Sequence, residues 1–254
     1  MRITIKIGSN VLTRKDGSLD VTRMSALVDQ IATLRADGHE IILVSSGAVA
    51  SGRSELKHIQ HDLDSVDQRQ LFSAVGQAKL INRYFELFRE YSIPVGQVLT
   101  TKENFSDSEH RKNQENCMRV MLENEVLPIV NENDTVSVTE LMFTDNDELS
   151  GLIAKMTNSQ MLIILSNIDG VFTGNPDNPE SRLISIVKPG KSLEDYIQAS
   201  KSSAGRGGMK SKSSVAQQTA AAGISVIIAN GKRDDILVRL MNDRDNTPCT
   251  EFLC

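Results

Sequence analysis

Short, continuously apolar runs alternate with longer amphipathic segments along the chain. The apolar runs predict strands over residues 3–7, 40–44, 93–99, 126–130, 161–165 and 224–228. Segments with apolar residues three and four positions apart predict helices over residues 21–36, 67–91, 111–124, 146–157 and 213–222. Strands that are apolar throughout are typical of a parallel sheet covered on both faces. The pattern therefore predicts an open α/β/α sandwich with a mainly parallel central sheet.

The remaining pattern bears on domain organisation. A length of 254 residues allows one large α/β domain or two small ones, and we expect a single domain over residues 1–254. Glycines and prolines are spread through the polar stretch 173–212, which predicts a hairpin followed by a mobile loop. Apolar residues make up 39% of the chain and charged residues 24%, which fits a folded globular protein.

Charge and cysteine content narrow the class of protein. The chain has 28 Lys and Arg against 33 Asp and Glu, a net charge of −5, and lacks a long basic block, so we expect no nucleic-acid partner. It also lacks a signal-peptide pattern and an apolar run of membrane-spanning length, so we expect a cytoplasmic protein without a membrane partner. Three cysteines without ligand spacing, and His58 and His61 without acidic or Cys partners, predict no disulfide framework and no metal site.

Small and polar residues follow four of the predicted strands at the point where each strand ends. The carboxyl ends of parallel strands meet at one edge of a sheet, where open α/β folds bind ligands. Gly8 and Gly47 precede helical segments, where bare backbone N–H groups can approach a phosphate. Each segment alone is also consistent with a turn or a helix cap. Together they predict a ligand site formed by Lys6-Ile7-Gly8-Ser9, Ser45-Ser46-Gly47-Ala48, Asn131-Glu132-Asn133-Asp134 and Ser166-Asn167-Ile168-Asp169-Gly170.

The phosphate-binding motifs of several other folds are missing. Gly190-Lys191-Ser192 has Ser185 where a P-loop requires its first glycine. Gly205-Arg206-Gly207-Gly208 is followed by Met209-Lys210, which does not complete the dinucleotide-binding pattern. In His110-Arg111-Lys112, a lysine stands where a protein kinase has its catalytic aspartate. A P-loop, a Rossmann cofactor site and a protein-kinase site are therefore disfavoured.

Two charged segments are candidates for the chemistry. Asp145-Asn146-Asp147 lies at a predicted helix start, where one carboxylate can cap the helix, but two exceed what one cap requires. Lys210 and Lys212 follow a glycine turn at a helix start, where the helix dipole disfavours positive charge. Either a bound anion compensates these lysines or they are merely solvated.

Together these motifs resemble the amino-acid kinase family over residues 3 to about 252. The resemblance is closest to the branch that transfers the γ-phosphate of ATP to the γ-carboxylate of L-glutamate. That reaction gives glutamyl 5-phosphate in the first step of proline biosynthesis, and it implies a carboxyl-acceptor phosphotransferase. The resemblance rests on Lys6-Ile7-Gly8-Ser9, the run from Val44 to Arg53, Ala74-Val75-Gly76-Gln77, Gly96-Gln97, Val130-Asn131-Glu132-Asn133-Asp134, Thr144-Asp145-Asn146-Asp147, Asp169-Gly170-Val171-Phe172-Thr173 and Gly207-Gly208-Met209.

The resemblance implies an acidic-substrate half over about residues 1–150 and a nucleotide half over about 151–254. Catalysis would involve Lys6 and Lys212 on either side of the transferred phosphoryl group, with Asp147 orienting both lysines. Gly47 would lie along the phosphates. Glutamate would contact Ser46, Asp134 and Asn146, so that N-acetylation of the substrate would leave Asp134 unpaired. ATP would contact Lys6, Gly8, Ser166, Asn167, Arg206, Gly207, Gly208, Met209, Lys210, Ser211 and Lys212.

The same resemblance implies Mg²⁺ bound as MgATP without a complete protein cage, proline as feedback inhibitor and a homo-oligomer. Ser166-Asn167 stands where the family commonly has Thr-Asp, and Arg206 where it often has Thr. Many relatives continue into a C-terminal PUA domain, so we expect a short form without it. Two alternatives stay open: another acid or phosphate kinase of this fold, such as acetylglutamate kinase or aspartokinase, and a catalytically silent sensor. The lysine pair and Asp147 argue against the sensor, because binding alone does not require transition-state neutralisation.

Overall fold

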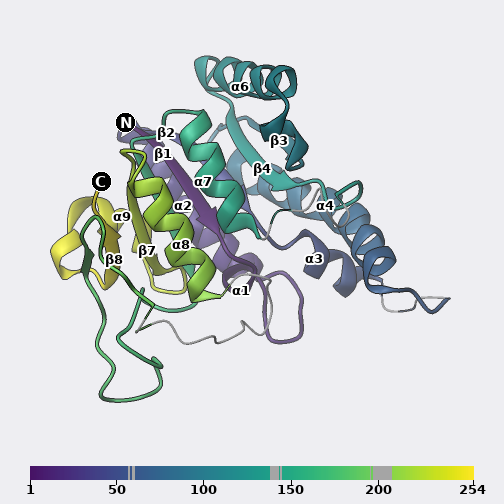
Figure 1. Ribbon diagram of the computed structural model, residues 1–254. Helices are drawn as coiled ribbons and strands as arrows, with labels where there is room; N and C mark the ends of the chain where they lie inside the picture. The colour runs from purple at the N-terminus through teal and green to yellow at the C-terminus, as the bar shows by residue number, and fades with distance from the viewer. Residues whose placement is uncertain (57, 59–60, 138–142, 144, 195, 197–207) are drawn as a thin grey trace.

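The computed structural model describes residues 1–56, 58, 61–137, 143, 145–194, 196 and 208–254 (Figure 1). Within this part of the chain, one sheet has the strand order β3-β4-β2-β1-β5-β7-β8-β6. All neighbouring strands are parallel except β7 and β8. The predicted mainly parallel sheet is thereby confirmed. The strands are β1 (Arg2–Ile7), β2 (Glu40–Ser45), β3 (Val95–Thr100), β4 (Leu127–Glu132), β5 (Met161–Ser166), β6 (Ile186–Val187), β7 (Ser225–Asn230) and β8 (Cys249–Phe252).

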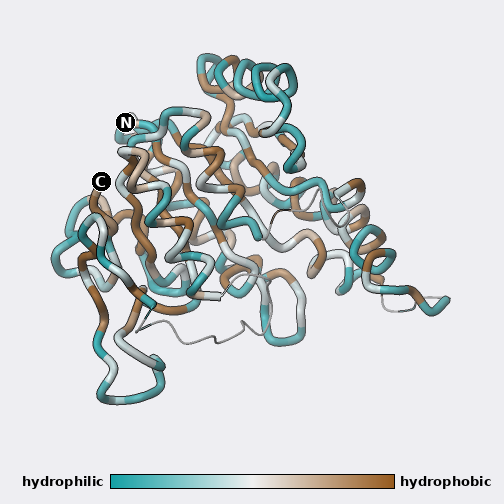
Figure 2. Tube along the Cα trace, in the orientation of Figure 1, coloured by the Kyte–Doolittle hydropathy of each residue, from teal (hydrophilic) through white to brown (hydrophobic). Residues whose placement is uncertain are grey.

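Helices cover both faces of this sheet, as the continuously apolar strands predict. One face packs against α2 (Val21–Ala36), α4 (Ser65–Arg89) and α9 (Ile236–Asn242). The other packs against α6 (Ser108–Glu123), α7 (Asn146–Met156) and α8 (Met209–Ala220). The apolar residues of the chain are concentrated in the central strands, while the projecting loops are hydrophilic (Figure 2). The predicted α/β/α sandwich is therefore confirmed.

Alternation along β1 decides which side chains reach the site. Ile3, Ile5 and Ile7 are fully buried in the core beneath α2. The intervening side chains point to the opposite face, where the Thr4 hydroxyl contacts Ser159 at 2.9 Å. Lys6 shares that face at the carboxyl end of the strand. The strand thus buries an apolar side chain at every second position and presents a lysine toward α7.

Two short helices after strand ends, and one close crossing of helices, shape the edge of the sheet at which the parallel strands end. The loop after β1 enters α1 (Ser9–Leu12), and that after β2 enters α3 (Ala48–Glu55). Helix α3 crosses α4 closely, because a Cβ atom on Gly52 would lie 1.8 Å from the Phe72 carbonyl oxygen. Likewise, a Cβ on Gly76 would lie 1.8 Å from the Ala48 carbonyl oxygen. Glycine at both positions lets the two backbones touch and holds the start of α3 at the sheet edge.

The structure corrects several predicted elements. Helix α8 begins at Met209 rather than at residue 213, directly after the extended residue Gly208. Its first turn was not predicted because it is polar and has no apolar periodicity. The short elements α3, α9 and β8 and the short helix α5 (Glu103–Ser106) were not predicted. Phe172, directly before the stretch 173–212, forms an antiparallel bridge with Leu183 within it, which accounts for the hairpin. Residues 195 and 197–207 of the predicted loop lie outside the described residues.

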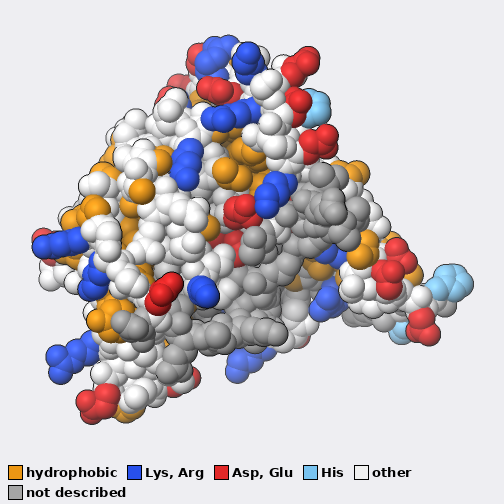
Figure 3. Space-filling model, in the orientation of Figure 1, with side chains coloured by type: hydrophobic (Ala, Val, Ile, Leu, Met, Phe, Trp, Pro, Cys, Tyr) orange, Lys and Arg blue, Asp and Glu red, His pale blue; other side chains and the backbone are white. Residues whose placement is uncertain are grey.

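Helix α6 covers the edge of the sheet with little burial. Met118 is its one fully buried side chain, and most of its other residues are exposed. Acidic and basic side chains crowd this end of the molecule (Figure 3). Among the described helices, none combines the length and the apolar character needed to cross a membrane.

Candidate active site

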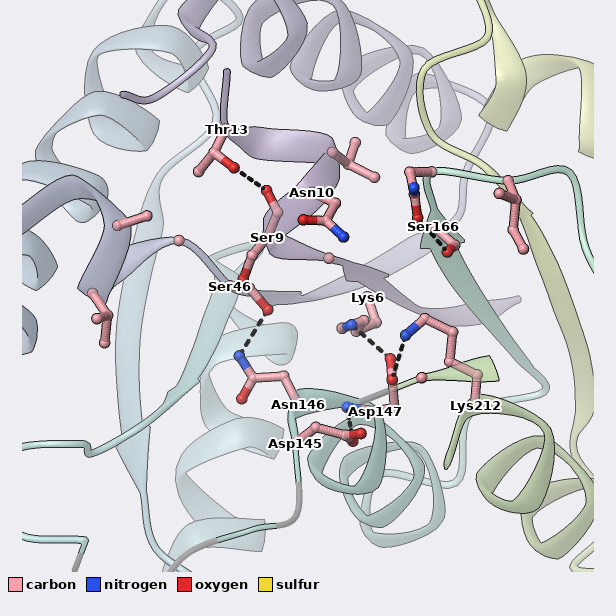
Figure 4. A pocket seen from close by; sticks show the side chains of 18 of the residues that line it. Lys6, Ser9, Asn10, Thr13, Ser46, Asp145, Asn146, Asp147, Ser166 and Lys212 are labelled. Atoms are coloured by element: carbon pink, nitrogen blue, oxygen red, sulfur yellow. Dashed lines mark hydrogen bonds and ion pairs between the residues drawn. The ribbon is translucent and has the colours of Figure 1, made fainter. Parts of the chain in front are cut away.

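The carboxyl ends of β1, β2, β4 and β5 border a cleft of about 1110 Å³. Most of the predicted site residues line it and point into it from different elements (Figure 4). Lys210 and Ser211 are absent from the lining among the described residues, and Arg206 and Gly207 lie outside them. The predicted residues that line the cleft are Lys6, Gly8, Ser46, Gly47, Asp134, Asn146, Asp147, Ser166, Asn167, Gly208, Met209 and Lys212.

Asp147 lies between the two predicted catalytic lysines. Its Oδ1 is 2.6 Å from Lys6 Nζ, and its Oδ2 accepts a hydrogen bond of 2.9 Å from Lys212 Nζ (Figure 4). All three side chains are buried, and Asp147 is fully so. Burial alone raises the pKa of the Asp147 carboxyl, but the two lysines outweigh it and hold the pKa below its usual value. The cluster therefore carries two positive charges and one negative charge at the floor of the cleft.

Asp145 explains how α7 and α8 come together at this point. Its Oδ1 accepts hydrogen bonds from the backbone N–H groups of Asp147 at 2.9 Å and Glu148 at 3.0 Å, capping α7. Its Oδ2 accepts a hydrogen bond of 2.5 Å from the Ser211 hydroxyl in the first turn of α8. The two acidic residues that the sequence places together thus have separate partners. Asp145 joins the helix starts, and Asp147 binds the lysines.

Asn146 belongs to a chain of polar side chains on the other side of Lys6. Its Nδ2 donates to Ser46 Oγ and to Asn131 Oδ1, each at 3.0 Å. Asn131 Nδ2 in turn donates to Gln77 Oε1 at 2.9 Å. The structure thus brings together the predicted residues Ser46 and Asn146. It also gives Asn131, a member of the predicted ligand site, a defined partner, and it adds Gln77, for which no role was predicted.

Asp134 has a partner that the sequence analysis missed. Arg69, on α4, donates from Nε to Asp134 Oδ1 at 2.7 Å, and a second hydrogen bond comes from Nη2. Nη2 also lies 2.9 Å from Glu132 Oε2. The expectation that loss of a substrate ammonium would leave Asp134 unpaired is therefore wrong. The one sequence signal for Arg69 is its place on the helical face that carries Phe72 and Gly76.

Glu132 is the second carboxylate that binds Arg69, and with Arg69 and Asp134 it forms an acidic cluster. It is buried, and its Oε1 accepts hydrogen bonds from Ser137 Oγ at 2.8 Å and from the backbone N–H of Phe143 at 3.0 Å. Together with Asp134 it gives two carboxylates for one guanidinium. The cluster has a net negative charge, opposite to that of the lysine pair.

Gly8 and Gly47 matter at the strand ends because they have no side chain. The N–H of Gly8 donates to the Leu165 carbonyl at 3.1 Å, so the expectation of a bare N–H at this residue is wrong. A Cβ on Gly8 would lie 3.5 Å from Lys6 Nζ, so its absence keeps the approach to that ammonium open. Gly47 has a φ of 106°, which L-residues with side chains rarely adopt. Among the described residues, no group of three His, Cys, Asp or Glu could hold a metal ion.

Asp169, part of the predicted ligand segment after β5, does not line the cleft. Arg233 donates to both of its oxygens at 2.7 and 2.6 Å, and Asn230 donates at 3.1 Å. The hydrogen bonds from Arg233 are the main reason that the pKa of Asp169 lies below its usual value. This residue therefore ties the loop after β5 to the loop after β7.

Comparison with known proteins identifies the family to which this chain belongs. Residues 1–230 match the family model described as the amino acid kinase family. The chain is 69% identical over 252 residues to a glutamate 5-kinase of Bacteroides thetaiotaomicron, covering 99% of this chain and 70% of that protein. It is 46% identical over 238 residues to a glutamate 5-kinase of Chlorobaculum tepidum, covering 93% of this chain and 65% of that protein. The chain therefore belongs to the amino acid kinase family.

A solved structure supports the fold independently of sequence. The crystal structure of UMP kinase from Ureaplasma parvum superposes with a TM-score of 0.66 at 16% identity. The alignment covers 100% of this chain and 98% of that one. At this identity the likeness concerns the fold alone.

Proposed function

We propose that the chain catalyses ATP-dependent phosphorylation of the γ-carboxylate of L-glutamate, the first step of proline biosynthesis. The observation that carries this proposal is the pair of buried lysines on Asp147, beside the polar group of Ser46 and Asn146. The 69% identity to a glutamate 5-kinase supports the same substrate. In this assignment the chain is a carboxyl-acceptor phosphotransferase.

The proposed reaction is an in-line transfer. A γ-carboxylate oxygen of glutamate attacks the γ-phosphorus of ATP, and the bond to the β,γ-bridging oxygen breaks as the new O–P bond forms. ADP leaves with that electron pair. A carboxylate is already ionised at pH 7, so no general base is needed. The protein's part is to position the reactants and to neutralise charge on the phosphoryl oxygens.

The residues divide these tasks in our proposal. Lys6 and Lys212 are catalytic residues that contact the phosphoryl oxygens, and Asp147 holds both ammonium groups in place. Glutamate lies against Ser46, Asn146 and the Arg69–Asp134 pair. The net negative charge of the pair together with Glu132 suits the α-ammonium group of a free amino acid. ATP lies along Gly8, Gly47, Ser166, Asn167, Gly208 and Met209, with Arg206, Gly207 and Lys210 retained as predicted contacts.

We further propose that Mg²⁺ arrives as MgATP, with the nucleotide phosphates as its principal ligands. The described residues do not provide a metal site of their own, so no catalytic step is assigned to a protein-bound ion. A cytoplasmic location and a homo-oligomeric state remain proposals that follow from the family.

The test of the reaction is an acceptor panel. The protein is incubated with MgATP, hydroxylamine and glutamate, aspartate or N-acetylglutamate, and the acyl phosphate is trapped as a hydroxamate. We expect glutamate to be strongly preferred, because the acetyl group removes the ammonium charge that the acidic cluster favours. Equal turnover of N-acetylglutamate would assign the chain to acetylglutamate kinase activity, and preferred turnover of aspartate to aspartokinase activity. Binding of glutamate or ATP without ADP release would indicate a sensor.

Inhibition by proline is proposed from the family and from the polar segment 53–67 beside the substrate end of the sheet. Arg53 of this segment lines the cleft, whereas residues 57, 59 and 60 lie outside the described part. We expect proline to compete with glutamate. Titrating proline at low and at saturating glutamate tests this, since equal inhibition at both concentrations contradicts competition.

A further inference from the structure

The hydrogen bond between Ser211 and Asp145 has no place in the reaction described above. Ser211 lies next to Lys212 in the first turn of α8, and Asp145 lies two residues before Asp147 at the start of α7. The Ser211 hydroxyl donates to Asp145 Oδ2 at 2.5 Å. Two neighbouring side chains of α8 are therefore bound to two neighbouring carboxylates of α7.

We propose that Ser211 is a positioning residue that places Lys212 for phosphoryl transfer by fastening the start of α8 to Asp145. This inference rests on the proposed function, and it reassigns a residue that the family resemblance had placed among the ATP contacts. Ser211 then acts through Lys212 and does not bind the nucleotide.

The burial and the hydrogen bonds of Asp145 support this role for Ser211. Asp145 is buried, and its other oxygen is engaged by the backbone of α7, so its carboxylate has a fixed orientation. A hydroxyl donating to a carboxylate makes a charge-assisted hydrogen bond, which is stronger than a neutral one. The cap of α8, Gly208, provides no side-chain hydrogen bond for the helix start. The Ser211–Asp145 contact therefore supplies a side-chain anchor for this turn.

The anchor acts on the orientation of Lys212 as well as on its distance. Lys212 Nζ contacts Asp147 at the end of a long, flexible side chain. Buried residues farther along α8, such as Ala216 and Ala220, hold the body of the helix, but they lie one to two turns away from Lys212 and do not by themselves fix its first turn. The contact of Ser211 with Asp145, one residue away from Lys212, fixes that turn. Small displacements of a group aimed at a transition state reduce the rate strongly, by up to about 100-fold per ångström.

The central experiment compares Ser211→Ala with Ser211→Thr and with Ser214→Ala. Ser214 is an exposed serine on the same helix and serves as the matched control. We expect Ser211→Ala to lower kcat by about 10-fold, with both KM values within about twofold of wild type. Threonine retains the hydroxyl and should restore most of the rate, and Ser214→Ala should behave as wild type. Melting curves of all variants check that each is folded.

A double-mutant cycle tests the partner. Asp145→Ser keeps a good N-cap for α7 but is too short to accept from Ser211. We expect this variant to lose kcat to a similar extent, and the double variant Asp145→Ser/Ser211→Ala to lose little more than either alone. If the two losses multiplied instead, the residues would act separately and the proposal would be wrong.

The other outcomes are equally decisive. A rise in KM for ATP with kcat retained would make Ser211 a nucleotide contact and overturn the positioning role. Retention of more than about half of kcat in Ser211→Ala would also overturn it, given the roughly 10-fold loss expected. Each variant is compared with wild type on whichever acid the wild type phosphorylates. A wrong substrate assignment is therefore visible in the wild type alone and is not confused with failure of this inference.

Discussion

Lys6 and Lys212 direct their ammonium groups at the two oxygens of the same carboxylate, although they come from β1 and α8 near opposite ends of the chain. Both side chains are buried, so their positions are set by the fold rather than by solvent. Asp147 gives one negative charge for these two cations, and both lysines line the cleft. An ATP phosphate is the anion that our proposed function supplies there.

Replacing Lys212 by Met tests this use of the charge. We expect kcat to fall by about 100-fold to 1000-fold, which is typical of removing one preorganised donor aimed at the transition state. Fold and glutamate KM should change little, because Asp147 keeps Lys6 as its partner. The matched control is Lys188→Met, which removes an exposed lysine away from the cleft. A Lys212→Met variant with more than about a third of wild-type kcat would contradict the catalytic role.

Replacing Asp147 by Asn affects both rate and stability. We expect kcat to fall about as much as in Lys212→Met, because mispositioned lysines act nearly like absent ones. The free energy of unfolding should also fall by about 3 kcal/mol, since two lysines stay buried without their anion. Steady-state kinetics and urea unfolding measure the two effects.

The double variant Asp147→Asn/Lys212→Met separates these effects. Removing one lysine relieves part of the charge repulsion, so it should be more stable than Asp147→Asn alone. Its kcat should lie close to that of either single variant, because the groups act as a unit. A further drop in stability would show that the ion pair is not what Asp147 contributes to folding.

Replacing Arg69 by Met tests the acidic cluster. Arg69 contacts two buried carboxylates, Glu132 and Asp134, and is itself largely buried. Its loss leaves two like charges close together, so we expect the free energy of unfolding to fall by about 3 kcal/mol. Arg69→Lys keeps the charge but not the planar fork, and should lose clearly less. Urea unfolding measures both variants, and an equal loss in the two would contradict an electrostatic role.

Much of the sheet could be predicted because its strands are apolar on both faces. Residues 40–44 and 161–165 carry a strand signal that does not depend on distant partners. Lys6 and Asp147 were predicted for the site from the family resemblance, and the carboxyl ends of β1 and the start of α7 do meet. Short elements such as α3 escaped prediction, since their small residues give no helical period. The packing of α3 depends on the contact of Gly52 with α4, which lies farther along the chain.

Side-chain partners were harder to predict than site positions. Asp134 was expected to pair with a substrate ammonium, but it pairs with Arg69, which lies 65 positions earlier in the chain on α4. Sequence order gives no sign of that pairing. The same holds for Gly8. Its N–H is not available to a phosphate because it donates to the carbonyl of Leu165 in the neighbouring strand. Pairings of this kind are set by tertiary contacts, which local patterns do not encode.

Asp169 provides a test of pH dependence. Hydrogen bonds from Arg233 are the main cause of its lowered pKa, so the folded state binds this proton less tightly than the unfolded state does. Its contribution to stability is therefore complete above the ordinary Asp pKa of about 3.9 and is lost as pH falls through the lower folded-state value. Because the pair is partly exposed, we expect Asp169→Asn to lower the free energy of unfolding by about 1 kcal/mol at pH 7. Urea unfolding of both proteins from pH 7 downward should show this difference shrinking below about pH 4. Asp177→Asn, which changes an exposed aspartate, serves as the control. If the difference in the free energy of unfolding between wild type and Asp169→Asn stayed constant on acidification, the charge of the Asp169 carboxylate would not be its source.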